Sequence, residues 1–339
     1  MLIRAKAPLR ISFAGGGTDV APFPEREGGL VLNATINRYA YGTLRPRSDE
    51  KITIHSFDYG SSIELAPQEV PVLDGKLDLA KAAIQRFAGT DAGGFDLLLH
   101  SNAPPGSGLG ASSAMMVALI GVLKEFAGIA LTDYELAEEA HRIEREELGI
   151  RGGRQDQYAA AFGGFNFIEL HGDHVVVNPL RIAEDIVLEL EHNLLLCYTG
   201  TTRQSDHIIE DQMGRFEAGN SDAVEGLRAQ KDLARQLKDA LLQRHLDDFG
   251  ELLDAAWQTK KLLSTRISNA RIDELYREAR TAGALGGKVA GAGGGGYLLL
   301  YCQHDRKHEV ARRMQQLGAT VSDFAFEHTG LRTWRADGN

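Results

Sequence analysis

The chain has 339 residues, of which 43% are hydrophobic and 25% are charged, and its formal net charge at pH 7 is −10. This length and composition are typical of a globular protein with two domains of ordinary size. The acidic balance and the lack of a Lys/Arg-rich run argue against nucleic acid or an anionic membrane as a partner, and no apolar run reaches the ~18 residues of a membrane-spanning helix.

The cysteines and the N-terminus bear on the cellular compartment. Cys197 and Cys302 are the only cysteines, and each lies in an apolar, strand-like run, which disfavours a disulfide framework or a zinc site. The first residues, Met1 to Lys6, lack the long apolar core of a secretory signal. We therefore expect a cytoplasmic protein.

The first 185 residues predict strands and turns, followed by alternating helices and strands. Thr132 and Glu135 have the spacing of a capping box, which marks the start of a helix. The expected elements are strands over 2–13, 30–45 and 51–57, a helix over 76–88, a strand over 95–100, helices over 111–127 and 132–148, and strands over 165–170 and 174–178.

From residue 185 the pattern changes to long amphipathic stretches. The expected elements there are a strand over 193–198, helices within 203–282, a strand over 297–301, a helix over 305–316 and a last strand over 319–326. We therefore predict two α+β domains, residues 1–185 and 186–339, with a cleft between them.

Residues 104–114, Pro-Pro-Gly-Ser-Gly-Leu-Gly-Ala-Ser-Ser-Ala, carry three glycines and then two adjacent hydroxyls at the start of an apolar helix. Glycines let a backbone approach a ligand closely, and a helix N-terminus presents unpaired N–H groups. The hydroxyls can reach phosphate oxygens or a bound Mg²⁺. The segment predicts a nucleoside triphosphate site made of Pro105, Gly106, Ser107, Gly108, Leu109, Gly110, Ala111, Ser112 and Ser113.

Three other interpretations of this segment exist. A Walker A loop needs a lysine after its last glycine, and none follows Gly110. A dinucleotide fingerprint, Gly106-x-Gly108-x-x-Ala111, also needs an acidic residue about 20 positions on at the end of a strand, but Glu125 lies inside a predicted helix. A plain glycine-rich turn capped by serine stays open for this loop alone.

Two further glycine-rich segments weaken the interpretation as a plain turn. Residues 14–19, Ala-Gly-Gly-Gly-Thr-Asp, follow the first strand, and residues 288–296, Lys-Val-Ala-Gly-Ala-Gly-Gly-Gly-Gly, precede the strand at Tyr297. So many glycines are entropically costly unless the backbone needs special dihedral angles or contacts something. We expect the three loops to converge on one ligand in the cleft.

In order and content the three segments resemble the motifs of the GHMP kinase superfamily, over essentially the whole chain. Finer features resemble the D-glycero-α-D-manno-heptose 7-phosphate kinases, namely Arg10 to Asp19, Gly153 to Ala160 and Phe162 to Phe167. The resemblance implies an N-terminal ribosomal-S5-like domain and a C-terminal ferredoxin-like domain. It also implies an enzyme that uses ATP and Mg²⁺ to phosphorylate the anomeric (C1) hydroxyl of a small sugar phosphate, on the route to activated heptose.

The resemblance assigns roles to single residues. Asp156 matches the family's catalytic aspartate, and Arg10 matches the basic residue that faces it and neutralises charge on the phosphoryl group. Ser112 and Glu144 match the magnesium-binding pair, since a hydroxyl and a carboxylate completed by phosphate oxygens and waters suit Mg²⁺. The alternatives are a helix cap for Asp156 and a solvated helix position for Glu144.

Asp19 matches the aspartate that binds sugar hydroxyls, and we expect Gly16, Gly17, Thr18, Gly293 and Gly294 beside the substrate. Galactokinase-type sequences carry Glu-His where this chain has Gly16-Gly17, so the galactose pose does not transfer, and Ala111 replaces the family's first serine. A substrate that already carries a phosphate needs extra positive charge. Arg203 is the preferred ligand for that phosphate, with Lys260 or Lys261 as the second choice.

Two other functions stay open from the sequence. A kinase of another sugar, such as fucose, would share the motifs without needing a ligand for a substrate phosphate. A non-catalytic relative that senses ATP and sugar would not need Asp156, Arg10, Glu144 and Ser112 together. The assembly is open between a monomer and a homodimer, and the residues that contact adenine are not identified.

Overall fold

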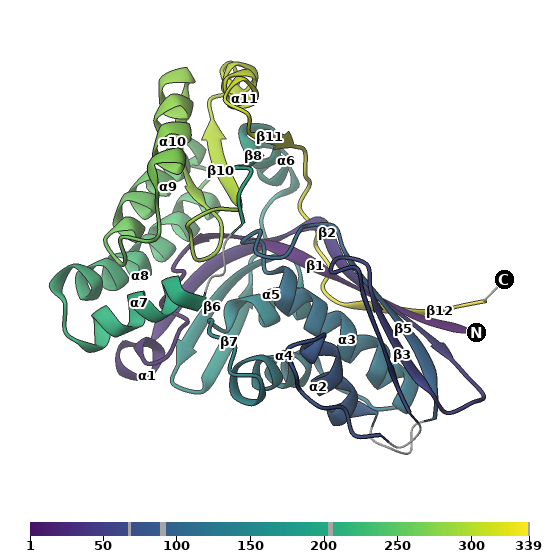
Figure 1. Ribbon diagram of the computed structural model, residues 1–339. Coiled ribbons are helices and arrows are strands. Elements are labelled where there is room, and N and C mark those ends of the chain that lie inside the picture. The colour runs from purple at the N-terminus through teal and green to yellow at the C-terminus, as the bar shows by residue number, and fades with distance from the viewer. Residues whose placement is uncertain (67–68, 89–92, 203–205, 338–339) are drawn as a thin grey trace.

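The computed structural model describes residues 1–66, 69–88, 93–202 and 206–337. It shows an α+β protein built on two sheets with helices packed against them (Figure 1). In chain order the elements are β1 (Leu2–Ala14), α1 (Phe23–Glu27), β2 (Gly29–Pro46), β3 (Ile52–Ser56), β4 (Ser61–Leu65), α2 (Asp78–Phe87), β5 (Phe95–Ser101), α3 (Ala111–Ala127), α4 (Asp133–His141), the π-helix η1 (Arg142–Glu147), α5 (Gln155–Phe162), β6 (Phe165–His171), β7 (His174–Pro179), α6 (Glu184–Asn193), β8 (Leu194–Tyr198), α7 (Asp206–Glu217), α8 (Ser221–Leu242), α9 (Leu246–Lys261), α10 (Ala270–Ala282), β9 (Ala284–Val289), β10 (Tyr297–Cys302), α11 (Lys307–Gln316), β11 (Thr320–Ser322) and β12 (Arg332–Ala336).

The larger sheet is organised around β2, a strand of 18 residues. One edge of β2 pairs antiparallel with β1, and its other edge pairs with β6 through residues 29–34 and with β5 through residues 40–46. The strand order is β12-β1-β2-β5-β3-β4, with β6 and β7 beside the first half of β2. Because β2 reaches across both parts of this sheet, it joins the strands that carry the first glycine-rich segment to those that precede the second.

Helix α3 lies in the core of this half, packed against β1 and β2, with α2, α4 and α5 beside it (Figure 1). Every residue from Ser113 to Leu123 is buried. A helix that is apolar around its whole circumference belongs inside a protein rather than on its surface. The N-terminus of α3 is therefore fixed in place by the packing of the rest of the helix.

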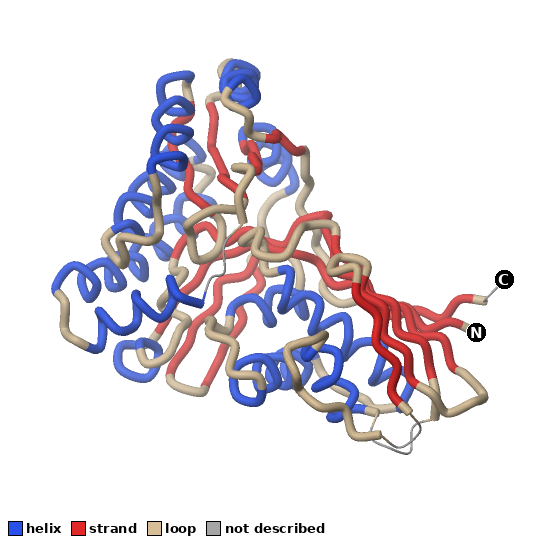
Figure 2. The backbone as a smooth tube through the Cα atoms, in the orientation of Figure 1, coloured by secondary structure: helices blue, strands red, loops and turns tan. Residues whose placement is uncertain are grey.

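The smaller sheet is antiparallel, in the order β11-β8-β10-β9, and appears in Figure 2 as a separate group of strands. Helices α9 and α10 pack against β9. One hydrophobic cluster continues across the two halves, where the ring of Phe13 on β1 meets that of Phe249 on α9 edge to face with centroids 5.3 Å apart. A second cluster, around Trp257 and Leu298, lies in the second half. In the part of the chain that the structure describes, none of the helices has the length and apolar content to cross a bilayer.

The end of the chain differs from the sequence prediction. A last strand was expected over 319–326, whereas β11 is shorter and the final strand is β12, which pairs antiparallel with β1. The two ends of the chain therefore lie side by side in the larger sheet (Figure 1). Most of β12 is exposed, so its sequence, Arg-Thr-Trp-Arg-Ala, lacks the apolar alternation that marks a half-buried strand.

Candidate active site

A cleft of about 640 Å³ lies between the two halves, a size typical of small-molecule sites. The three glycine-rich segments all line it, through Gly16 and Gly17, residues 105–108 and 110–113, and residues 290–293 with Gly295. The fold thus brings together three loops that are far apart in the sequence.

The loop before α3 packs backbone to backbone against the late glycine loop. Gly108 has a φ of +82°, and a Cβ there would lie 2.4 Å from the carbonyl oxygen of Ala290. The N–H of Tyr297 donates to the carbonyl oxygen of Ser107 at 3.1 Å. Only glycine fits at position 108, and this close contact joins the two halves of the molecule at the cleft.

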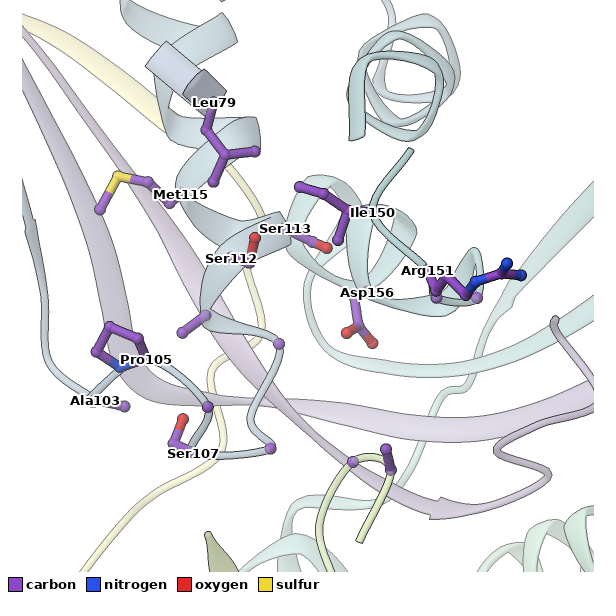
Figure 3. A pocket seen from close by; sticks show the side chains of 18 of the residues that line it. Leu79, Ala103, Pro105, Ser107, Ser112, Ser113, Met115, Ile150, Arg151 and Asp156 are labelled. Atoms are coloured by element: carbon purple, nitrogen blue, oxygen red, sulfur yellow. The ribbon is translucent and has the colours of Figure 1, made fainter. Parts of the chain in front are cut away.

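Helix α3 begins at the cleft without a side-chain cap in the described chain. Its N-cap residue is Gly110, in the left-handed conformation. The first N–H groups and the positive end of the helix dipole are therefore available to an anion. Ser107 adds a buried hydroxyl with no hydrogen-bond partner among the described residues. Figure 3 shows Ser107 on the loop and Ser112 and Ser113 at the start of the helix.

The other predicted members of this loop take different positions. Pro105, Gly106 and Ala111 line the cleft. Leu109 is fully buried in the core, and its carbonyl oxygen accepts from the N–H of Arg10 at 3.0 Å. Ser113 lies at the cleft wall, but its hydroxyl accepts from Nε2 of Gln157 at 3.1 Å. Leu109 and Ser113 therefore hold the loop and the helix in place.

Arg10 and Asp156 form an ion pair at the cleft. Arg10 is 4% exposed on β1, and its Nε and Nη2 each lie 2.7 Å from Oδ1 of Asp156. Its Nη1 donates to the carbonyl oxygen of Gly108 at 2.6 Å. Asp156 stands in the first turn of α5. It lies close to the glycine loop, as a Cβ on Gly110 would be 3.3 Å from Oδ2 of Asp156. The guanidinium thus holds this carboxylate beside the glycine loop, and Figure 3 shows Asp156 among the residues that line the cleft.

Ser112 and Glu144 also meet. The hydroxyl of Ser112 donates to Oε1 of Glu144 at 2.9 Å, and Nε2 of Gln157 donates to its Oε2 at 2.6 Å. Glu144 is fully buried, and both of these partners are neutral, so a cation would complete the site. Within the described residues no group of three or more His, Cys, Asp or Glu is gathered around a common point. A hydroxyl and one carboxylate are donors of the hard type that Mg²⁺ prefers.

The position of Glu144 depends on a π-helical turn. The sequence predicted one helix over 132–148, but α4 ends at His141 and residues 142–147 are π-helical, with the N–H of Leu148 bonded to the carbonyl oxygen of Ile143 at 3.0 Å. An i→i+5 bond widens the turn and changes the direction of the side chains that follow, and such turns are frequent at functional sites.

In the first glycine-rich segment, Thr18 and Asp19 are both buried. The hydroxyl of Thr18 lies 2.7 Å and 2.9 Å from the carbonyl oxygens of Gly15 and Leu30, so it holds the loop rather than facing the cleft. Asp19 lines the cleft and accepts from the N–H of Gly17 at 3.0 Å and from Nε2 of Gln155 at 3.1 Å. Its carboxylate thereby couples this loop to α5.

In the late glycine-rich segment, Gly293 lines the cleft, whereas Gly294 is buried. The N–H of Gly294 donates to the carbonyl oxygen of Ile267 at 2.8 Å, and its own carbonyl accepts from Nδ2 of Asn269 at 3.2 Å. Arg203, the preferred phosphate ligand in the sequence prediction, lies outside the described residues.

The structure distinguishes the two adjacent lysines of α9. Lys260 is 3% exposed and lines the cleft, whereas Lys261 lies over the ring of Trp257, 5.8 Å from its centroid. Burial and the Arg10 guanidinium lower the pKa of Lys260 to about 8, while Asp19 and Asp156 act in the opposite direction. Sequence reasoning assigned no role to Gln155 or Gln212, which also line the cleft. Gln155 directly precedes Asp156, and that adjacency was the available signal.

One end of the cleft is apolar. Leu79, Leu99, Met115 and Leu119 line it beyond the start of α3, and Tyr59 lies on the same side. Figure 3 shows Leu79 and Met115 beside the first turns of that helix. A flat aromatic ring would fit such a lining.

Comparison with known proteins agrees with this geometry. Residues 78–164 match the family GHMP kinases N terminal domain, and residues 237–320 match GHMP kinases C terminal. The chain is 39% identical over 337 residues to the D-glycero-alpha-D-manno-heptose 7-phosphate kinase of Campylobacter jejuni subsp. jejuni, which covers 98% of this chain and 99% of that protein.

Two further relatives extend the comparison. The crystal structure of a D-glycero-D-manno-heptose 1-phosphate kinase from Bacteroides thetaiotaomicron matches with a TM-score of 0.84 at 35% identity, covering 99% of this chain and 100% of that one. A bifunctional fucokinase/GDP-fucose pyrophosphorylase of Arabidopsis thaliana is 25% identical over 329 residues, which are 92% of this chain but 31% of that protein.

Proposed function

The chain belongs to the GHMP kinase family and is a sugar kinase, and on that premise we propose that it transfers the γ-phosphoryl group of ATP to the anomeric (C1) hydroxyl of a heptose 7-phosphate. The product is the 1,7-bisphosphate, a precursor of activated heptose for surface polysaccharide. The 39% identity to a heptose 7-phosphate kinase, over nearly the full length of both chains, supports this acceptor.

The observation that carries the proposal is the Arg10–Asp156 pair against the glycine loop, with Nε and Oδ1 2.7 Å apart. Asp156 accepts the proton of the acceptor hydroxyl. The oxygen of that hydroxyl bonds to the γ-phosphorus as the bond from the γ-phosphorus to ADP breaks and ADP leaves. Arg10 stabilises the negative charge on the transferring oxygens and orients the carboxylate. An anomeric hydroxyl is more acidic than an ordinary alcohol, so orientation by Asp156 contributes alongside proton removal.

The nucleotide occupies the other part of the cleft. Its phosphates lie at the uncapped N-terminus of α3 and along residues 105–113, where unpaired N–H groups and the Ser107 hydroxyl are available. The adenine ring lies at the apolar end, lined by Leu79, Leu99 and Met115. Ser112 and Glu144 would hold Mg²⁺, which would supply positive charge to the phosphates.

The names of the two heptose kinases differ in the position of the phosphate that the substrate already carries. The test is therefore ADP release with ATP and Mg²⁺ against heptose 7-phosphate, heptose 1-phosphate, mannose, mannose 6-phosphate and fucose. Phosphorus NMR of the product would then locate the new phosphate.

Turnover confined to heptose 7-phosphate, with the new phosphate on C1, is the expected result. Fast turnover of fucose or of heptose 1-phosphate instead would replace the proposed acceptor. If the protein binds ATP but releases no ADP in the presence of any of these acceptors, the result would contradict a sugar kinase of this specificity and favour a sensing role.

A further inference from the structure

Four polar side chains from four different elements surround Gly16 and Gly17. A Cβ on Gly16 would lie 3.6 Å from Nζ of Lys260 and 3.7 Å from both Nε2 of Gln155 and Oγ of Ser12. A Cβ on Gly17 would lie 2.3 Å from Nε2 of Gln212. These side chains come from β1, α5, α7 and α9, so both halves of the molecule contribute to the group.

These polar groups have few protein partners. Oγ of Ser12, Oε1 of Gln155 and Nε2 of Gln212 are buried without a hydrogen-bond partner among the described residues. Nζ of Lys260 donates to the carbonyl oxygen of Gly291 at 2.5 Å, which uses one of its three protons. Buried polar atoms in native proteins are nearly always hydrogen-bonded, so this cluster indicates a polar ligand between them.

The charges around Lys260 favour an anionic ligand. The groups that act on it are Arg10, which carries positive charge, and Asp19 and Asp156, which carry negative charge. Asp156 is already bound by Arg10, and Asp19 by a backbone N–H and the Gln155 amide. The direct partner of Lys260 is a neutral carbonyl, and a buried ammonium without an anion is costly.

Lys288 is a second buried amine near Lys260. It is 1% exposed on β9, and its Nζ has no hydrogen-bond partner within the described chain. Burial, Lys260 and Arg10 lower the pKa of Lys288 well below its usual value. Two buried amines thus lie close together while the nearby carboxylates are already engaged, so an anionic ligand would stabilise the charged form of either amine.

Resting on the proposed function, we propose that Lys260 binds a phosphoryl group in the part of the cleft beside Gly16 and Gly17. Ser12, Gln155 and Gln212 bind the sugar hydroxyls next to that phosphoryl group. The phosphoryl group has two sources: the phosphate that the acceptor already carries, or the γ-phosphoryl group in transit from the nucleotide. A lysine ammonium serves either, because it is a compact point charge with three rotatable donors.

The test compares wild type with Lys260→Met, Lys260→Arg and Lys261→Met. Lys261 is the matched control, since it is the next residue on the same helix but lies over Trp257. Calorimetry measures the binding of heptose 7-phosphate, mannose 6-phosphate, mannose and the non-hydrolysable nucleotide AMPPNP, and ADP release is measured in parallel. Thermal unfolding checks that each variant is folded.

If Lys260 binds the acceptor phosphate, Lys260→Met weakens binding of the two sugar phosphates by about tenfold or more and leaves mannose within about twofold. If it binds the γ-phosphoryl group, the loss appears in AMPPNP binding in the presence of mannose and in turnover. In both cases Lys260→Arg retains most of the function, and Lys261→Met matches wild type.

Wild-type values for every ligand and for turnover in a folded Lys260→Met variant would overturn the inference and leave the proposed function intact. A wild-type protein that binds none of the phosphorylated ligands would also overturn it. A third outcome is that wild type binds sugar phosphate, Lys260→Met does not, and neither protein releases ADP. That outcome would reject the proposed function and retain the role of Lys260.

Discussion

Nε of Arg10 donates a 2.7 Å hydrogen bond to Oδ1 of Asp156, a residue 146 positions later in the chain. The same guanidinium donates to the carbonyl oxygen of Gly108, so one side chain positions both the carboxylate and the glycine loop. This arrangement predicts that Asp156→Asn retains the fold and the nucleotide site, because an amide has nearly the same size as the carboxylate but accepts protons poorly.

For Asp156→Asn we expect ADP release in the presence of acceptor to fall by about 10²–10⁴-fold. Binding of AMPPNP, followed by calorimetry, should stay within about twofold of wild type, because the loop and the start of α3 are unchanged. Turnover close to that of wild type would remove Asp156 from the chemistry.

Glu144 and Ser112 lead to a prediction about metal dependence. Glu144→Gln removes the buried negative charge while an amide oxygen stays near Ser112. We expect the Mg²⁺ concentration for half-maximal ADP release to rise by about tenfold or more, since carboxylate charge governs Mg²⁺ binding. Binding of Mn²⁺ observed by electron paramagnetic resonance provides a readout besides activity.

Ser113→Ala is the matched control for the metal site. Ser113 follows Ser112 in the sequence, and its hydroxyl accepts from Gln157, whereas it is the hydroxyl of Ser112 that donates to Glu144. We expect its Mg²⁺ dependence to match that of wild type. An unchanged Mg²⁺ titration in Glu144→Gln would assign the metal to other ligands.

The lowered pKa of Lys260 predicts how acceptor binding depends on pH. Its pKa is about 8 in the free protein, because burial and Arg10 disfavour the charged form against the opposing effect of Asp19 and Asp156. Only the charged form attracts a phosphoryl group. Affinity for a sugar phosphate should therefore fall as pH rises through 8, by about tenfold per pH unit above it, while the phosphate itself, with a second pKa of about 6, stays dianionic.

Lys260→Arg separates this effect from other titrations, since a guanidinium stays charged throughout the range. Calorimetric titrations with mannose 6-phosphate between pH 7 and pH 10 would compare the two proteins. A decline of the same size in both would assign the pH dependence to another group, such as Lys288, which shares the same surroundings.

The close backbone contact at Gly108 leads to a prediction about substitution in the loop before α3. Alanine there meets the carbonyl oxygen of Ala290 at 2.4 Å and also has to adopt a φ of +82°. Gly219 has a φ of +70° but nothing within 4 Å of an added Cβ, so Gly219→Ala isolates the backbone strain, which costs about 1–2 kcal/mol.

We expect Gly108→Ala to lower the melting temperature more than Gly219→Ala and to raise KM for ATP by about tenfold or more, because displacement of the loop misplaces the phosphates. Gly219→Ala should leave KM for ATP unchanged. Equal effects of the two changes on stability and on KM would mean that the loop tolerates a side chain at position 108.

Much of the fold and part of the site could be predicted because their causes are local. The capping box at Thr132 is present, with the hydroxyl of Thr132 accepting from the N–H of Glu135 at 3.2 Å. The α+β architecture with GHMP kinase domains is confirmed as well. Hydrophobic periodicity, helix caps and glycine-rich loops are determined by neighbouring residues, so they can be predicted without the tertiary structure.

The remaining features depend on tertiary contacts. Helix α5, which carries Asp156, begins without a side-chain cap, so nothing in the local sequence marked its start. The directions of Lys260 and Lys261 differ by about 100° around a helix, and only the packing of α9 shows which of them enters the cleft. Lys288 follows two glycines in β9, and only the packing of the other elements shows that it is buried.

Lys288 leads to a prediction about stability. Its Nζ is buried without a partner in the described chain, and its pKa in the folded protein lies well below the usual value of 10.5. Between the folded and the unfolded pKa the unfolded chain binds more protons, so wild-type stability rises with pH across that window. Methionine has a similar length and does not titrate. Lys288→Met should therefore be more stable than wild type at pH 7, by about 1 kcal/mol or more.

The advantage of Lys288→Met should shrink as pH approaches 10.5, where an unfolded lysine also loses its proton. Denaturant unfolding at pH 7 and at pH 10 measures both effects, with Lys261→Met as a control that stays within about 0.5 kcal/mol of wild type. Retention of a destabilising lysine inside the fold is expected where its amine serves a ligand. A Lys288→Met variant less stable than wild type at pH 7 would instead show that the lysine stabilises the packing of β9.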